Sequence, residues 1–133
     1  MKLFKPNLFQ TGKFHLHSHI DSTFKIECDA LCNKDWNTLA DIIHSKILFK
    51  SVFGIPRGGL KFAKTLQKYE SSHSQNILIV DDVLTTGSSM EEYKEKLIKK
   101  NSFTSHWTTE IKGAVVFARR PCPKWIIPIF KMY

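Results

Sequence analysis

The sequence predicts a single α/β domain in which helices flank a parallel β-sheet. Short apolar runs alternate along the chain with segments of helical periodicity, an order that favours right-handed crossovers between parallel strands. The run Ile77–Val80 contains only branched apolar residues, which is typical of a strand buried on both faces. The length of 133 residues is that of one domain with a sizeable core.

The amino-terminal part of the chain predicts two short strands and a helix. Apolar residues alternate with histidines over residues 14–19, which indicates a strand, and residues 23–27 are its expected partner. Asn33 or Asp35 is the expected cap of the helix that follows. The apolar stripe of this helix consists of Trp36, Leu39, Ile42, Ile43 and Ile47.

The remaining elements continue the alternation of strands and helices. We expect residues 51–55 to form a strand, and the helix after the turn 56–59 to carry Leu60, Ala63, Leu66 and Tyr69 on one side. The polar loop 71–76 leads to a strand over 77–80, a helix over 90–98, a strand over 114–118 and an extended segment over 125–130.

The segment after the strand 77–80 carries the most informative chemistry. Two carboxylates, Asp81 and Asp82, precede a hydroxyl-rich turn that opens a helix, and this turn consists of Thr85, Thr86, Gly87, Ser88 and Ser89. A helix N-terminus favours a phosphate because its N–H groups are unpaired and its dipole end is positive. Carboxylates repel a phosphate but suit ribose hydroxyls or a metal ion. The pattern therefore indicates a site for a phosphorylated sugar.

The stretch Val80–Ser88 resembles the phosphoribosyl pyrophosphate (PRPP) signature of the type I phosphoribosyltransferases. The resemblance implies that Asp81 and Asp82 hold the ribose hydroxyls and that the turn Thr85–Ser89 wraps the 5-phosphate. It also implies Mg²⁺ as cofactor, with Asp81 and Asp82 as its candidate protein contacts. A homodimer is a further expectation from the resemblance.

Two other protein classes also place paired acids after an apolar strand, and the sequence argues against both. A P-loop requires the pattern G-x-x-x-x-G-K-[ST], but Leu60 stands at the lysine position of the nearest candidate, Gly54–Lys61. A receiver domain requires a phosphorylatable aspartate on a later strand, and Asp82 is the last aspartate of the chain.

The turn Pro56-Arg57-Gly58-Gly59 is a second candidate site for an anion. Glycines let backbone amides approach an oxyanion, and the planar guanidinium of arginine matches a phosphate. The turn resembles the pyrophosphate-binding loop of the same family, which implies that role for Arg57, Gly58 and Gly59. Both loops are expected at the carboxyl ends of parallel strands, where open α/β sheets bind their ligands.

The amino-terminal third resembles the orotate phosphoribosyltransferase branch. Residues 14–18 and 22–24 are similar to the segment that forms a hood over the base in that branch, although His17 stands where the branch has a lysine. We therefore divide the single domain, residues 1–133, into a hood of about residues 1–34 and a core of about 35–133. By the same resemblance, His17 and Arg119 (or its neighbour Arg120) are candidate contacts of the base.

Two features of the sequence leave alternatives open. His15, His17 and His19 would share one face of a strand. This leaves three alternatives: the histidines hold a metal, His17 contacts the base, or the three form a plain polar face. The family's orotate enzymes close a long mobile loop over PRPP, whereas only residues 60–76, mostly helix, precede the Asp-Asp strand here. Three alternatives follow for this loop: a truncated lid over PRPP suffices, another subunit supplies the lid, or the chemistry has been lost.

Composition agrees with a small enzyme of a reducing compartment, and we expect the cytoplasm. No apolar stretch is long enough to span a membrane, and the three cysteines are an odd number that argues against a disulfide framework. The net charge of +8 attracts polyanions, so that nucleic acid is not excluded as a partner.

The sequence thus predicts a PRPP-dependent phosphoribosyltransferase that transfers ribose 5-phosphate to a nitrogenous base, orotate-like or another nucleobase, and releases pyrophosphate. The alternative from another class is a non-catalytic module that binds PRPP or a nucleotide, with RNA as a possible partner. The sequence does not identify the base.

Overall fold

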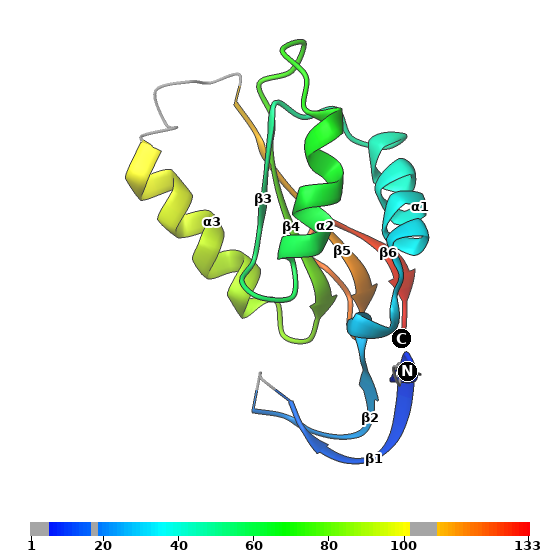
Figure 1. Cartoon of the computed structure of the whole chain (residues 1–133). Helices are drawn as coiled ribbons and strands as arrows, with labels where there is room; N and C mark the ends of the chain where they lie inside the picture. Colours follow the sequence, from blue (N-terminus) through cyan, green and yellow to red (C-terminus); the bar gives the residue numbers. More distant parts are fainter. Residues whose placement is uncertain (1–5, 17–18, 102–108) are drawn as a thin grey trace.

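The computed structural model describes residues 6–16, 19–101 and 109–133, and its centre is a four-stranded parallel sheet (Figure 1). The strands β3 (Ser51–Gly54), β4 (Ile77–Leu84), β5 (Ile111–Ala118) and β6 (Ile126–Lys131) lie side by side in chain order. The predicted α/β class with a parallel sheet is confirmed, and β4 is longer than expected because both acids, Val83 and Leu84 belong to it.

Helices cover both faces of the sheet, as predicted. Helices α1 (Asn33–His44) and α2 (Leu60–Leu66) lie on one face, and α3 (Ser88–Asn101) lies on the other (Figure 1). A 3-10 turn, η2 (Gln67–Tyr69), extends α2. Alternate residues of β4 enter the two cores, since Leu78 and Val80 pack with α1 and α2 whereas Ile77 and Ile79 pack with α3.

Two details of the helices differ from the expected patterns. Helix α1 has Cys32 as its N-cap, and Asp35 completes the cap by accepting the Cys32 backbone N–H at 2.9 Å. In α2 the buried stripe includes Phe62, which is fully buried, whereas Leu60 is half exposed. Leu60 is the first residue of α2, where the helix end leaves room for solvent.

The hood is an antiparallel hairpin of β1 (Phe9–His15) and β2 (Asp21–Ile26) below the carboxyl ends of the central strands (Figure 1). A short 3-10 turn, η1 (Cys28–Ala30), leads from it to α1. No helix among the described residues is long and apolar enough to cross a membrane.

The prediction of one strand over residues 14–19 is wrong. Strand β1 ends at His15, and the chain then turns, because the His19 N–H donates to the Leu16 carbonyl at 2.8 Å. His19 adopts a positive φ of 63°, which breaks the alternation of side chains. His15 and His19 lie 3.4 Å apart through ring nitrogens, and Asp21 binds the other nitrogen of His15 at 2.9 Å. His17 lies outside the described residues.

Candidate functional site

Asp81 and Asp82 lie in the carboxyl-terminal half of β4 and are half-buried. Each carboxylate accepts the next backbone N–H, from Asp82 to Asp81 at 2.8 Å and from Val83 to Asp82 at 2.7 Å. Burial, and then the charge of Asp82, raise the pKa of Asp81 to about 8.

The hydroxyl-rich turn connects β4 to α3 and bends where Gly87 adopts a φ of +86°. The Thr86 and Ser88 hydroxyls are 2.9 Å apart, and the Ser88 N–H donates to the Thr86 hydroxyl at 3.3 Å. Thr86, Ser88 and Ser89 are exposed, at the N-terminus of a helix of 14 residues. Hydroxyls and first-turn N–H groups here can surround an anion.

The acidic residue in the first turn of α3 is hydrogen-bonded to a neighbouring segment. Glu91, in the first turn of α3, accepts the indole N–H of Trp125 at 2.8 Å. Trp125 also lies under the ammonium group of Lys94, 4.6 Å from the ring centre. The carboxylate of Glu91 is therefore occupied on the side of the β5–β6 connection.

The turn Pro56–Gly59 lies next to the acids, because β3 and β4 are neighbours and both end at the same edge of the sheet. The Ile55 N–H donates to the Val80 carbonyl at 2.9 Å, and the Gly59 N–H donates to the Ile55 carbonyl at 2.8 Å. The peptide bond between Pro56 and Arg57 is cis, and the Arg57 side chain is exposed.

The closest approach between turn and acids is at Gly58. A Cβ on Gly58 would lie 2.5 Å from both carboxylate oxygens of Asp82, closer than any real contact. A Cβ on Gly59 would lie 2.4 Å from the Val80 carbonyl oxygen. A side chain at either position would require these neighbours to move, and the turn Pro56–Gly59 therefore lies directly against the Asp82 carboxylate.

Arg119 joins the hood to the core. Its guanidinium donates to the Ser22 hydroxyl and, at 3.3 Å, to the Phe24 carbonyl, and it lies 3.8 Å from the centre of the Phe24 ring. Its backbone N–H donates to the Leu84 carbonyl at 2.9 Å. Burial lowers the pKa of Arg119. The sequence placed both Arg119 and Ser22 near the base, and the fold brings them into contact.

The hood also contains a cavity of about 450 Å³. Its lining consists of Lys13, Phe14, His15, Asp21, Ser22 and Thr23. These residues come from both strands of the hairpin, at the end where the chain turns.

Cys28 is the residue near the site that sequence reasoning missed. Burial, and then the negative charge of Asp82, raise the pKa of its thiol. The sequence gave no reason to place Cys28 near the acids, because 53 positions separate it from Asp81.

The predicted site residues therefore fall into two groups. Asp81, Asp82, the turn Thr85–Ser89 and the turn Arg57–Gly59 lie together at the carboxyl edge of the sheet. Arg119 lies between this edge and the hood, and His17 lies outside the described residues.

Comparison with known proteins gives the fold. No family model and no curated protein matches the sequence. Among solved structures, the orotate phosphoribosyltransferase of Aeropyrum pernix superposes with a TM-score of 0.70 at 20% identity, over 94% of this chain and 89% of that one. The chain has the fold of the type I phosphoribosyltransferases.

Two further structures agree with this result. The orotate phosphoribosyltransferase of Mycobacterium tuberculosis H37Rv gives a TM-score of 0.64 at 12% identity, over 93% of this chain and 89% of that one. The orotate phosphoribosyltransferase of Francisella tularensis gives a TM-score of 0.59 at 15% identity, over 93% of this chain and 80% of that one. The chain thus spans most of an orotate phosphoribosyltransferase, although the sequences have diverged widely.

Proposed function

We propose that this protein is a phosphoribosyltransferase that transfers ribose 5-phosphate from PRPP to a nitrogen of a base and releases pyrophosphate. The observation that carries the proposal is the contact of the Gly58 backbone with the Asp82 carboxylate. It sets a candidate diphosphate loop against a candidate ribose ligand, and the ribose C1 of PRPP is the atom that joins these two groups.

The three parts of the site take the three parts of PRPP. Asp81 and Asp82 hold the ribose hydroxyls, the turn Thr85–Ser89 holds the 5-phosphate, and Arg57 with the Gly58–Gly59 amides holds the diphosphate. The bond from C1 to the diphosphate oxygen breaks with its electron pair leaving on pyrophosphate, and a bond from C1 to the base nitrogen forms. Positive charge that develops on the sugar is offset by the nearby carboxylates, and fixed charges of this kind are an effective catalytic device.

Mg²⁺ fits the donors of this site if the ligand shares it. No group of three or more histidine, cysteine or acidic side chains among the described residues is placed to hold a metal. Mg²⁺ in proteins is often bound through one or two carboxylates together with substrate phosphates, which is what Asp81 and Asp82 can provide. The ion would neutralise the charge of the leaving pyrophosphate.

The base would enter between the carboxyl edge of the sheet and the hood. His17 and Arg119 stay our candidates for contacting it. The Arg119 guanidinium already donates to Ser22 and Phe24, so that a base must either replace these partners or use a free edge of the guanidinium. The identity of the base depends on this contact.

A screen for pyrophosphate release tests the proposal. The protein is incubated with PRPP, Mg²⁺ and each of orotate, uracil and the purine bases. We expect release with at least one base, and we expect Asp82→Asn to reduce it at least 100-fold, since a transition-state charge partner is worth about 3 kcal/mol or more. Glu95→Gln, which neutralises an exposed carboxylate on α3, is the matched control. Release that is unchanged in Asp82→Asn contradicts the role of the acids.

A non-catalytic module that binds PRPP or a nucleotide is the second candidate. The observation that favours it is the short connection between η2 and β4, residues 70–76, which leaves little chain to close over a reactive sugar. Calorimetric binding of PRPP without pyrophosphate release from any base supports this reading. Light scattering tests the homodimer that we expect in either case.

A further inference from the structure

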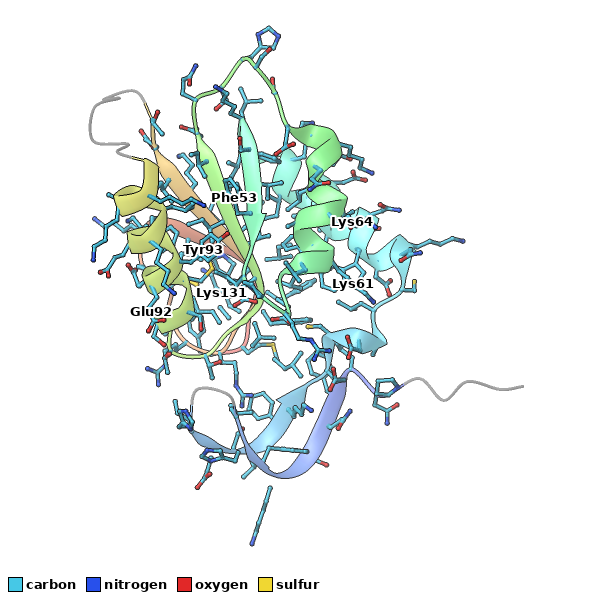
Figure 2. All side chains as sticks on the ribbon, turned by 60° about the vertical axis from the view of Figure 1, so that its left-hand side comes forward. Phe53, Lys61, Lys64, Glu92, Tyr93 and Lys131 are labelled. Carbon is cyan, nitrogen blue, oxygen red and sulfur yellow. The ribbon has the colours of Figure 1, made fainter. Side chains whose placement is uncertain are left out.

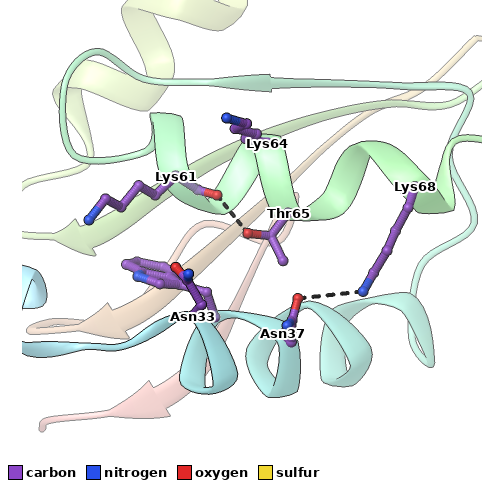
Figure 3. A pocket seen from close by; sticks show the side chains of 7 residues that line it. Asn33, Asn37, Lys61, Lys64, Thr65 and Lys68 are labelled. Carbon is purple, nitrogen blue, oxygen red and sulfur yellow. Dashed lines mark hydrogen bonds between the residues drawn. The ribbon is translucent and has the colours of Figure 1, made fainter.

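A groove of about 510 Å³ lies between α1 and α2 (Figure 3). Residues of α1 line one side, and residues of α2 and η2 line the other. The lining consists of Asn33, Trp36, Asn37, Lys61, Lys64, Thr65 and Lys68. Its volume is within the range of small-molecule sites, and none of these residues belongs to the site described above.

The groove is positively charged. Lys61, Lys64 and Lys68 are spaced by three and four residues, which places them on one side of α2 and its extension. All three are exposed, and none forms a salt bridge within the part of the chain that the structure describes. Figure 2 shows Lys61 and Lys64 projecting from α2, while Tyr93 of α3 lies beyond the sheet.

Among the described residues, no carboxylate lines the groove to balance these lysines. Lys68 donates to the side-chain oxygen of Asn37 at 3.5 Å, so that one amide N–H₂ group of α1 is left to face a ligand (Figure 3). Helix α1 carries two acids near the groove lining: Asp35 accepts the Cys32 N–H at the N-cap, and Asp41, one turn beyond Asn37, accepts the Tyr69 hydroxyl. The lining of the groove is therefore cationic.

Trp36 adds a donor that requires an acceptor. Its side chain is 3% exposed and packs 5.7 Å from the Phe62 ring, yet its indole N–H has no hydrogen-bond partner among the described residues. It is the one buried side-chain polar atom of these residues in that state. Buried donors are almost always satisfied, so this unpaired indole N–H marks the packing beneath the groove as unusual.

We propose that this groove binds a small ligand with a chain of two or more phosphates, either free or borne by a nucleotide. Lys61 and Lys68 are separated by seven residues, a rise of about 10 Å, so that a chain of phosphates meets all three lysines without requiring their side chains to converge on one point. A continuous nucleic-acid backbone fits less well, because the three lysines of the lining lie within the short segment 61–68. Trp36 lines the groove, so that its indole group reports on an anion bound there. The proposal does not depend on the activity proposed for the PRPP site.

Calorimetry with inorganic tripolyphosphate tests the site, and ATP in a second arm distinguishes a nucleotide-borne chain from a free one. All proteins carry Arg57→Gln, so that the diphosphate turn contributes little. The groove variant is Lys61→Gln/Lys64→Gln/Lys68→Gln. Its matched control, Lys96→Gln/Lys99→Gln/Lys100→Gln, removes the same charge from exposed positions of α3.

We expect the groove variant to bind at least one of the two probes about tenfold more weakly than the control variant does, or worse. Equal affinities in the two triple variants, or an RNA oligonucleotide that competes and binds more tightly than both probes, overturn the proposal. The indole ¹H–¹⁵N signal of Trp36, assigned by its loss in Trp36→Phe, gives an independent readout. We expect it to move on binding while that of Trp125, which already donates to Glu91, stays in place. An unmoved Trp36 signal at saturation also overturns the proposal.

Discussion

Replacing Gly58 by alanine separates the function of the acid pair from the stability of the fold. The new methyl group would lie 2.5 Å from both Asp82 carboxylate oxygens, where ordinary contact begins at 3.4 Å. The carboxylate must therefore retreat by about 1 Å, a displacement that in active sites can cost about 100-fold in rate. The φ of Gly58 is outside the left-handed region, so that alanine adds no backbone strain.

The cost in stability should be small, because the group that moves is the end of a side chain. Asp82 loses at most its bond from the Val83 N–H, which is worth about 1 kcal/mol. Gly59→Ala is the matched comparison: its methyl group would meet the Val80 carbonyl oxygen at 2.4 Å and the Ile55 nitrogen at 2.7 Å. These backbone atoms form the hydrogen bond between β4 and the turn, so that we expect a loss of about 1–3 kcal/mol or more.

Urea denaturation gives the stability of each variant, and calorimetry with PRPP together with pyrophosphate release gives its function. We expect Gly58→Ala to lose at least tenfold in PRPP affinity or turnover with a nearly unchanged unfolding midpoint. Gly59→Ala should lose both. A Gly58→Ala protein that binds PRPP and turns it over like the wild type refutes the assignment of Asp82 to the ribose.

Three other predictions concern the surroundings of the site. Arg119→Ala removes the hydrogen bonds to Ser22 and Phe24, so that the amides of β1 and β2 should exchange with solvent faster while those of β4 do not; equal exchange rates contradict an anchoring role. The pKa of Cys28 is raised in the folded protein, so the neutral thiol contributes fully to stability below the pKa of about 8.5 in the unfolded chain. Above pH 8.5 this contribution falls by about 1.4 kcal/mol per pH unit. Urea denaturation at pH 8 and pH 10 should show that Cys28→Ala loses less unfolding free energy between the two pH values than the wild type does. Equal losses in the two proteins contradict a raised pKa of Cys28. Glu70→Ala should cost about 1 kcal/mol of unfolding free energy, because the Glu70 carboxylate accepts the Val52 N–H at 2.9 Å; an unchanged midpoint would show that water replaces this bond freely.

Local patterns in the sequence were sufficient to predict most helices and strands and to indicate a candidate phosphate-binding turn. The apolar run Ile77–Val80 predicts a buried strand because it is short, consists of branched residues and lies between polar segments. The hydroxyls after Asp82 lie within one turn of each other along the chain, so that their grouping at a helix N-terminus needs no tertiary information. The pattern failed at residues 14–19, where a turn at a positive φ leaves no mark on an alternation of histidines.

Contacts between distant segments were decided by the tertiary structure alone. The sequence placed Gly58 and Asp82 in two separate motifs, and only the pairing of β3 with β4 shows that one is a glycine because the other's carboxylate occupies its side-chain space. The anchoring of the hood by Arg119 and the groove around Trp36 depend in the same way on packing across 95 and 29 positions of chain. Composition and spacing determine which groups a chain carries and how it folds locally, whereas proximity between remote groups arises only when the core closes around them.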